Sequence, residues 1–274
     1  MTDQKQIPLP PLSGWALILG ASSGFGEAVA LTLAEAGMSI VGVHLDRRST
    51  MPNVERICGR IREFGREAWF FNANAADPDK RAEVLNEIAR RFGERGSGEQ
   101  LRILLHSIAF GTLKPFISGD SAEECSQKQI EMTCDVMAHS LVYWVQDMLR
   151  RDLLSNEGRI YAMTSTGSSS VWKGYGAVSA AKSALESHIR QLALELGPRG
   201  ITANAICAGV TNTPAAQKIP GFDSMSQVAI RKNPAHRLTC TEDVARALVA
   251  LAQPCTYWLN GNVLFVDGGE AHSG

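Results

Sequence analysis

The sequence lacks the patterns that mark metal, secreted or membrane proteins. Its six cysteines are scattered, with no Cys-x-x-Cys pair and no nearby His pair at zinc spacing. Such cysteines are typical of small buried side chains in a reducing compartment, so we expect no metal. No run approaches the roughly 18 apolar residues of a membrane span, and the N-terminus has no stretch of signal-peptide length. We therefore expect a cytoplasmic protein with a short leader over residues 1–13.

An excess of charge of one sign is also missing. The chain of 274 residues has 27 Lys and Arg against 28 Asp and Glu, a formal net charge of -1. This balance gives no global attraction to nucleic acid or to an anionic membrane, and we expect neither as a partner. Hydrophobic residues make up 45% and charged residues 20%, which is ample for a core. Any anion site must be local.

Short apolar runs alternate with longer amphipathic ones along the chain. This rhythm predicts a parallel sheet covered on both faces. With no linker or repeat, the predicted fold class is α/β, a single Rossmann-type doubly wound parallel sheet flanked by helices on both faces, over residues 14–274. The expected strands are 15–19, 39–45, 68–72, 101–106, 158–164, 202–207 and 262–266, and the expected helices are 26–36, 54–64, 80–92, 126–154, 178–196 and 241–252.

One segment, from Thr213 to Arg237, departs from this rhythm. It places Pro214, Pro220 and Pro234 around short apolar patches. A loop of this length inside a compact domain is commonly functional. We predict a flap that covers the substrate.

A glycine-rich turn follows the first expected strand and leads directly into a helix. Its spacing is GxxxGxG, from Gly20 through Gly24 to Gly26. Glycines let the backbone turn tightly and let a pyrophosphate approach the free N–H groups and positive dipole end of the helix. The turn therefore predicts a dinucleotide phosphate site.

The tip of the second strand bears on which dinucleotide binds. An acidic residue there normally takes the adenosine ribose hydroxyls, and an Arg nearby accepts the extra phosphate of NADP. Counting from the glycine turn, the acidic position falls on His44 rather than on Asp46, and Arg47 and Arg48 follow. This favours NADPH and leaves NADH open, because a solvated charged turn also explains the two arginines.

From Trp15 to Gly269 these features resemble the short-chain dehydrogenase/reductase superfamily. Its ordinary members carry a Tyr four residues before a Lys, where this chain has Val178 before Lys182; the nearest preceding Tyr is Tyr175, seven residues away. This Tyr-x6-Lys spacing resembles the enoyl-[acyl-carrier-protein] reductases. Reducing a C=C bond conjugated to a thioester puts hydride on the β-carbon, so a displaced Tyr suits the altered geometry. Two helical turns still let both side chains face one cleft.

Other segments resemble the same branch. Leu105 to Gly111 is similar to its V-H-S-I segment, and Asp135 stands where ordinary members have Asn. Val210 to Thr213 matches its P-I-x-T segment with Val in place of Pro. The resemblance implies that the backbone of Thr211 meets the nicotinamide carboxamide and that Thr213 contacts the diphosphate. One position departs: the best-known enoyl reductases have a second Tyr where this chain has Ser165. The chain looks most like a variant bacterial branch that combines GxxxGxG with Tyr-x6-Lys. Because the ketone-reducing triad also has a Ser there, that activity stays open.

The resemblance implies reduction of trans-2-enoyl thioesters by NADPH, or by NADH, with substrates carried on acyl-carrier protein and a homotetrameric enzyme. The alternatives are a carbonyl, 3-ketoacyl or alcohol oxidoreductase of the same superfamily and a catalytically silent nucleotide-binding regulator. The candidate catalytic residues are Tyr175, Lys182 and Ser165. The candidate cofactor-binding residues are Gly20, Ser22, Ser23, Gly24, Phe25, Gly26, His44, Arg47, Arg48, Asn74, Ala75, Ser107, Ile108, Ala109, Lys182, Gly209, Thr211 and Thr213.

Overall fold

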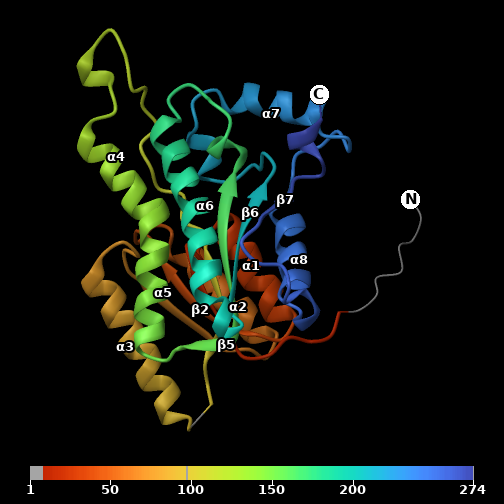
Figure 1. Cartoon of the computed structure of the whole chain (residues 1–274). Helices are drawn as coiled ribbons and strands as arrows, with labels where there is room; N and C mark the ends of the chain where they lie inside the picture. The colour runs from red at the N-terminus through yellow and green to blue at the C-terminus, as the bar shows by residue number, and fades with distance from the viewer. Residues whose placement is uncertain (1–8, 97, 274) are drawn as a thin grey trace.

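The computed structural model describes residues 9–96 and 98–273, and its strands form one parallel sheet (Figure 1). Most of the expected leader, residues 1–8, lies outside the described residues. The strand order is β3-β2-β1-β4-β5-β6-β7, as in a doubly wound fold. The strands are β1 (Trp15–Leu19), β2 (Ser39–His44), β3 (Ala68–Asn72), β4 (Leu101–His106), β5 (Leu154–Ser165), β6 (Thr202–Ala208) and β7 (Val263–Val266).

Helices cover both faces of this sheet, so the predicted fold class is confirmed. On one face Leu33 and Leu248 pack in one core cluster, and on the other Trp144 and Leu185 pack in a second. The first face carries α1 (Gly24–Glu35), α2 (Met51–Glu63) and α8 (Thr241–Leu251). The second carries α3 (Pro78–Glu94), α5 (Ser140–Arg150) and α6 (Gly176–Leu196).

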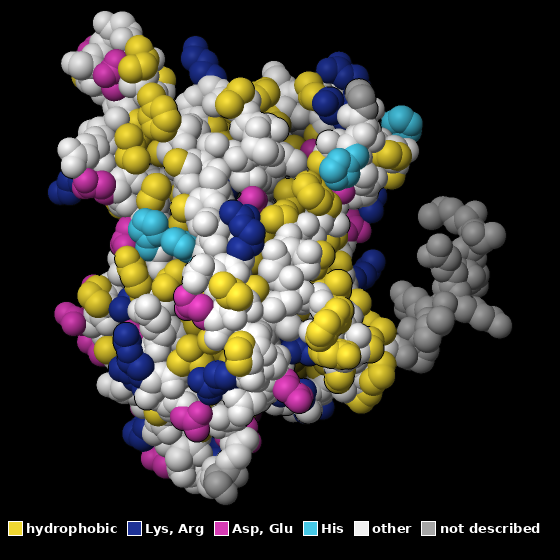
Figure 2. Space-filling view, viewed as in Figure 1, with side chains coloured by type: hydrophobic (Ala, Val, Ile, Leu, Met, Phe, Trp, Pro, Cys, Tyr) yellow, Lys and Arg dark blue, Asp and Glu magenta, His cyan; other side chains and the backbone are white. Residues whose placement is uncertain are grey.

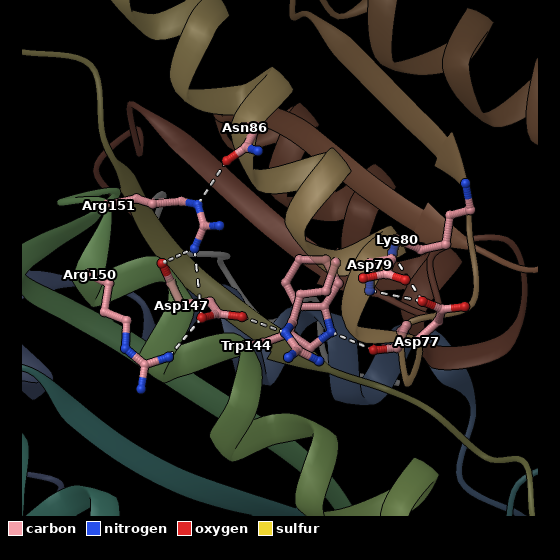
Figure 3. A network of polar contacts seen from close by, with 10 residues as sticks. Asp77, Asp79, Lys80, Asn86, Trp144, Asp147, Arg150 and Arg151 are labelled. Atoms are coloured by element: carbon pink, nitrogen blue, oxygen red, sulfur yellow. Dashed lines mark hydrogen bonds and ion pairs between the residues drawn. The ribbon is translucent and has the colours of Figure 1, made fainter.

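An ion-pair network joins α3 to α5 and fixes the segment that follows β3. Arg81 Nε lies 2.7 Å from Asp147 Oδ2, and Asp147 also accepts a hydrogen bond from Arg150 at 2.9 Å (Figure 3). Beside this network the buried Trp144 donates from Nε1 to the carbonyl oxygen of Ala75 at 2.8 Å. Since a buried indole N–H needs such a partner, the bond ties α5 to a segment that the sequence predicts to border the cofactor.

The long helical stretch expected over 126–154 is present, but it ends at Arg150 and includes a π-helical segment. The chain forms α4 (Gln127–Cys134), a π-helical segment (Asp135–His139) and α5, and it leaves the helix after Arg150. Two local features accompany these differences. The Ser140 hydroxyl donates to the Val136 carbonyl at 2.8 Å within the widened turn, and Asp152 takes a φ of 53° before Leu154 joins the sheet. Widened turns of this kind are frequent at functional sites.

The segment 213–237 is partly helical and rests on the loop after β5. It contains a short 3₁₀ turn (Ala216–Lys218) and α7 (Phe222–Lys232). Trp172 Nε1 donates to the Pro220 carbonyl at 2.8 Å. This bond ties the segment to the loop that leads into α6. None of the helices in the described ranges is long and apolar enough to cross a membrane.

Candidate active site

The residues that the sequence singles out gather where the carboxyl ends of β1 and β4 meet. The topology changes direction between these strands, which is where ligands bind in open α/β sheets. Gly20 has a φ of 87°, and a Cβ there would overlap the carbonyl oxygen of Ser107. Ser107 N in turn donates to Leu19 O at 2.9 Å. Only a glycine lets the two loops approach this closely.

The glycine turn forms a cradle at the N-terminus of α1. A Cβ on Gly26 would overlap the Gly20 carbonyl, so this close turn also requires glycine. Ser23 is the extended N-cap residue and makes no side-chain capping bond, which leaves the first N–H groups of α1 for an anion. Buried Thr213 lies over Gly24: a Cβ built on Gly24 would lie 3.5 Å from the Thr213 side chain. The cradle fits the diphosphate of a dinucleotide.

The tip of β2 holds a compact polar group. His44 is only 4% exposed, and its Nδ1 lies 3.0 Å from Asp46 Oδ2. Burial lowers the pKa of His44, although Asp46 opposes this. Partial burial raises the pKa of Asp46, but hydrogen bonds from Ser22, Thr50 and His44 outweigh it and hold that pKa below its usual value. The ring is therefore neutral and the carboxyl ionised at neutral pH.

The two arginines that follow are placed differently. Arg47 and Arg48 are exposed, and within residues 9–96 and 98–273 neither forms an ion pair. Two exposed cations beside the glycine turn can accept a phosphate, whereas the mostly buried His44 ring offers little surface to a ribose.

Lys182 anchors α6 on β5 through its buried ammonium. The side chain is 6% exposed, and Nζ donates to the carbonyl oxygen of Met163 at 2.7 Å. Burial lowers the pKa of Lys182 to about 8, while the negative charge of Glu186 opposes this shift. Thr164, next to Met163, donates from its hydroxyl to Glu186 Oε1 at 2.7 Å. Two adjacent residues of β5 thus hold one turn of α6.

Tyr175 and Ser165 meet beside Gly167. A Cβ at Gly167 would lie 2.5 Å from the Tyr175 ring and 3.2 Å from Ser165 Oγ. The pKa of Tyr175 is raised, because the effect of burial exceeds the opposing effect of the nearby Ser165 hydroxyl. Ser165 Oγ is buried, yet no group in the described part of the chain meets it in hydrogen-bond geometry. It can therefore donate to a substrate oxygen. The structure brings the three candidate catalytic residues to the carboxyl end of β5 and the start of α6.

The position of the usual family Tyr is filled by apolar packing. Val178 is 5% exposed and packs in a cluster with Met137 and Ala181, against which Tyr175 rests. A Cβ on Gly111 would come within 2.9 Å of Val178 Cγ2. No acid–base group stands at this position, and the space around it is closed.

The remaining sequence candidates lie along the same edge. His106 is fully buried, its Nε2 lies 2.9 Å from Ser140 Oγ, and burial with the charge of Lys182 lowers its pKa to about 3. It is therefore a neutral packed group and no general acid. Asp135 is half-buried and opens the π-helical segment. At neighbouring strand ends, Asn74 caps its own turn by accepting from Ala76 N at 3.1 Å.

Sequence reasoning missed three polar residues that hold the site. Asn53 of α2 donates to the Ser22 carbonyl at 2.7 Å and so fixes the glycine turn. Glu186 had a local signal, because it lies one helical turn after Lys182. Glu270 had none, since it contacts Val210 across 60 residues of sequence. Elsewhere in the described ranges, no cluster of three His, Cys, Asp or Glu side chains is arranged to hold a metal.

Comparison with known proteins places this site in a family. A family model described as "Enoyl-(Acyl carrier protein) reductase" matches residues 20–270. The NADPH-dependent aldehyde reductase-like protein of Arabidopsis thaliana is 28% identical over 97% of each chain. The 1-cyclohexenylcarbonyl-CoA reductase of Streptomyces collinus is 24% identical over 93% of this chain and 85% of its own. The enoyl-(acyl-carrier-protein) reductase of Anaplasma phagocytophilum, solved with NAD, superposes with a TM-score of 0.79 at 20% identity, over 95% of this chain and 93% of that one.

The fold and these matches define an oxidoreductase of the short-chain dehydrogenase/reductase superfamily. Within it, the chain belongs to the family that the matching model describes. Members of this superfamily among its neighbours bind NAD or NADP. The relatives reduce several kinds of substrate by name, aldehydes and an enoyl thioester among them, so the reaction of this chain has to be argued from its own site.

The contact at Gly167 yields a first prediction. In Gly167→Ala the new Cβ displaces the Tyr175 ring, and a shift of about 1 Å at a reacting group costs up to ~10²-fold in rate. We expect kcat to fall by more than about tenfold while the Kd for NADPH stays within about threefold. Gly93→Ala, in α3, is the matched control, because a Cβ there meets nothing within 4 Å. Unchanged kcat in Gly167→Ala would place Tyr175 away from the chemistry.

The buried ammonium yields a second prediction. Because the pKa of Lys182 lies near 8, its charge is present below that pH and is lost above it. We expect kcat/KM for the cofactor, which reports groups of the free enzyme, to fall as pH rises through about 8. A Lys182→Arg variant that retains turnover loses this fall, since a guanidinium stays charged. A profile that is flat to pH 10 in the unmodified protein contradicts the assignment.

Proposed function

We propose that the protein reduces the C=C bond of trans-2-enoyl thioesters with NADPH. The observation that carries this proposal is the pairing of Tyr175, at the start of α6, with a closed apolar position at Val178. The phenol stands about two helical turns from Lys182 instead of one. The cofactor supplies a hydride, and the residues of this chain deal with the charge that develops on the substrate.

The site residues suit that task. Burial keeps Tyr175 protonated at neutral pH, so it can donate a hydrogen bond, and then a proton, to the oxygen of an enolate. Ser165 offers a second, unpartnered hydroxyl for the same carbonyl. Lys182 is placed to hold the nicotinamide ribose and to contribute positive charge near the reacting atoms. No proton donor stands at position 178. Tyr175 and Ser165 therefore favour a substrate whose oxygen lies further from the carbon receiving hydride than it does in a ketone.

An apolar wall supports an acyl substrate. Phe116 packs against the backbone of Gly176 next to the phenol, and Trp172 holds the flap of residues 213–237. Both side chains are exposed, and so is that of Ile117, which follows Phe116 in the chain. Figure 2 shows hydrophobic side chains gathered on the lobe at upper left, which the segment between β4 and α4 forms in Figure 1. We infer that this lobe and the flap enclose the acyl chain and exclude water.

The carrier and the assembly follow from the same proposal. Lys218, Arg231 and Lys232 outnumber Asp223 on the flap, and Figure 2 shows basic side chains along the top of the molecule, where α7 lies. Such a rim favours an acidic carrier protein over a neutral one. We place the reaction in cytoplasmic fatty acid synthesis. We also propose a homotetramer, because the 3₁₀ turn after α8 and the edge strand β7 expose large apolar side chains, which are Tyr257, Trp258, Leu259 and Phe265.

A second candidate function is carbonyl reduction. It is favoured by Ser165, which stands beside Tyr175 as in the ketone-reducing triad, and by the relative named as an aldehyde reductase. The apolar packing at Val178 argues against it, because the Tyr that donates the proton in ordinary members is replaced there by a packed valine.

Paired substrates test the choice between the two. With NADPH we expect kcat/KM on crotonyl or longer trans-2-enoyl thioesters to exceed that on the matching 3-ketoacyl thioesters by more than about tenfold. Tyr175→Phe removes the proton donor and lowers the rate by about 10²–10⁴-fold. Tyr143→Phe, an exposed tyrosine of α5, serves as the control and keeps full activity. Preference for the ketoacyl thioester, with activity lost in Ser165→Ala, would make the protein a carbonyl reductase.

The cofactor preference has its own test. Replacing Arg47 and Arg48 by Ala removes two exposed charges beside the predicted ribose site. We expect KM for NADPH to rise by about tenfold or more, since hydrogen bonds to charged groups contribute ~1.5–3 kcal/mol, while KM for NADH stays unchanged. Arg66→Ala removes a similarly exposed arginine away from the site and is the control. Equal losses for both nucleotides, or none for either, contradict the phosphate role.

A further inference from the structure

The backbone that follows β6 runs through a narrow passage at the edge of the candidate site. Gly209 N donates to the carbonyl oxygen of Val266 at 3.4 Å. A Cβ on Gly209 would lie 2.8 Å from Glu270 Oε2 and would overlap the hydroxyl of Thr239. The segment from Gly209 to Thr211 therefore lies directly on the side chain of Glu270. By its resemblance to the family, this segment meets the nicotinamide carboxamide through the backbone of Thr211.

Glu270 is a buried carboxylate that this segment satisfies. It is 9% exposed, and both of its oxygens face Val210 N, at 3.3 and 3.2 Å. A buried carboxylate is costly unless it is hydrogen-bonded, and a buried backbone N–H is costly in the same way. The contact therefore satisfies the buried carboxylate of Glu270 and gives a partner to the amide of Val210, which is partly buried.

The residue at position 210 distinguishes this contact from the resembling segment of the enoyl reductases. The resembling segment of the enoyl reductases has Pro where this chain has Val210. Proline has no N–H to donate, so that backbone needs no acceptor. Val210 introduces a donor at the edge of the site, and Glu270 supplies the acceptor from 60 residues further along the chain.

The position of Glu270 is itself fixed by the C-terminal turn. The carboxylate of Asp267 accepts from Gly269 N at 2.9 Å and from Ala271 N at 2.8 Å. The Asp267 carbonyl accepts from the Asn233 side chain at 2.9 Å, at the end of α7. The side chain and the carbonyl of Asp267 thus both fix the turn that carries Glu270, and the turn fixes the position of the Glu270 carboxylate.

We propose that Glu270 is a positioning residue that holds the Gly209–Thr211 backbone in the conformation that receives the nicotinamide carboxamide. The inference rests on the cofactor site of the proposed function and is independent of the substrate reduced. Glu270 acts on the cofactor only through Val210, so its effect depends on the N–H at that position. This dependence separates positioning from a general contribution to folding.

A double-mutant cycle tests the proposal. The Kd for NADPH is measured by fluorescence for the unmodified protein, Glu270→Ala, Val210→Pro and the double variant. Loss of a buried bond to a charged acceptor costs ~1.5–3 kcal/mol, so we expect Glu270→Ala to weaken binding by about 10–100-fold. The double variant has neither donor nor acceptor and returns to within about threefold of the unmodified protein. Glu242→Ala, at an exposed position of α8, is the control.

A second readout does not involve the cofactor. Hydrogen exchange at the Val210 amide is expected to be faster in Glu270→Ala and unchanged in Glu270→Gln, whose amide oxygen still accepts the bond. Unchanged NADPH affinity in Glu270→Ala, or a double variant that loses the sum of both single effects, overturns the proposal. An unmodified protein that binds neither NADPH nor NADH overturns the cofactor site instead. If Glu270→Ala does not fold, Glu270→Gln decides: affinity within about threefold of the unmodified protein supports positioning, and a larger loss overturns it.

Discussion

The buried ammonium of Lys182 is the interaction on which the rest of the site depends. Its hydrogen bond to the Met163 carbonyl ties α6 to β5 close to where that strand ends. Once that turn of α6 is fixed, the residues before it are fixed too: Val178 faces the apolar cluster and Tyr175 stands at the start of the helix. The charge also affects the reaction. A buried ammonium in a low-dielectric environment stabilises nearby negative charge far more than an ammonium in water does.

A second constraint is the close approach of backbone at the carboxyl ends of the strands. Gly20 lets the loops after β1 and β4 touch, and Gly209 lets the loop after β6 pass over Glu270. Both are positions where a side chain would displace backbone or a buried polar group. Both close approaches lie at the carboxyl ends of the strands, where dinucleotides bind in open α/β sheets.

Much of this was predictable from the sequence, because the signals are local. The strand at 15–19 and the glycine turn after it follow from a run of apolar residues and a spacing, and the structure has both where expected. The same holds for the separation of Tyr175 from Lys182, which is counted directly. The π-helical segment at Asp135 was not predictable, because helical periodicity continues through it. Within it the Ser140 hydroxyl donates to the Val136 carbonyl, a local contact that leaves no trace in the spacing of apolar residues.

Contacts between distant parts of the chain were beyond sequence reasoning for a different reason. Trp172 reaches the flap, and Glu270 reaches Val210, only because the fold places both partners at one edge. The burial of His44 is a similar case: its position at a strand tip suggested contact with the cofactor, and only the structure shows that the ring is buried beside Asp46 and Phe70. Side-chain partners that are set by topology leave no spacing to count.

Deuterium labelling shows whether this site directs hydride to the β-carbon of the substrate, the carbon furthest from the Tyr175 and Ser165 donors. A trans-2-alkenal offers a conjugated C=C bond and a carbonyl group in the same molecule. With NADPH deuterated at the transferring carbon, the account predicts a saturated aldehyde that carries deuterium at the β-carbon. An allylic alcohol that carries deuterium at the carbonyl carbon would contradict it.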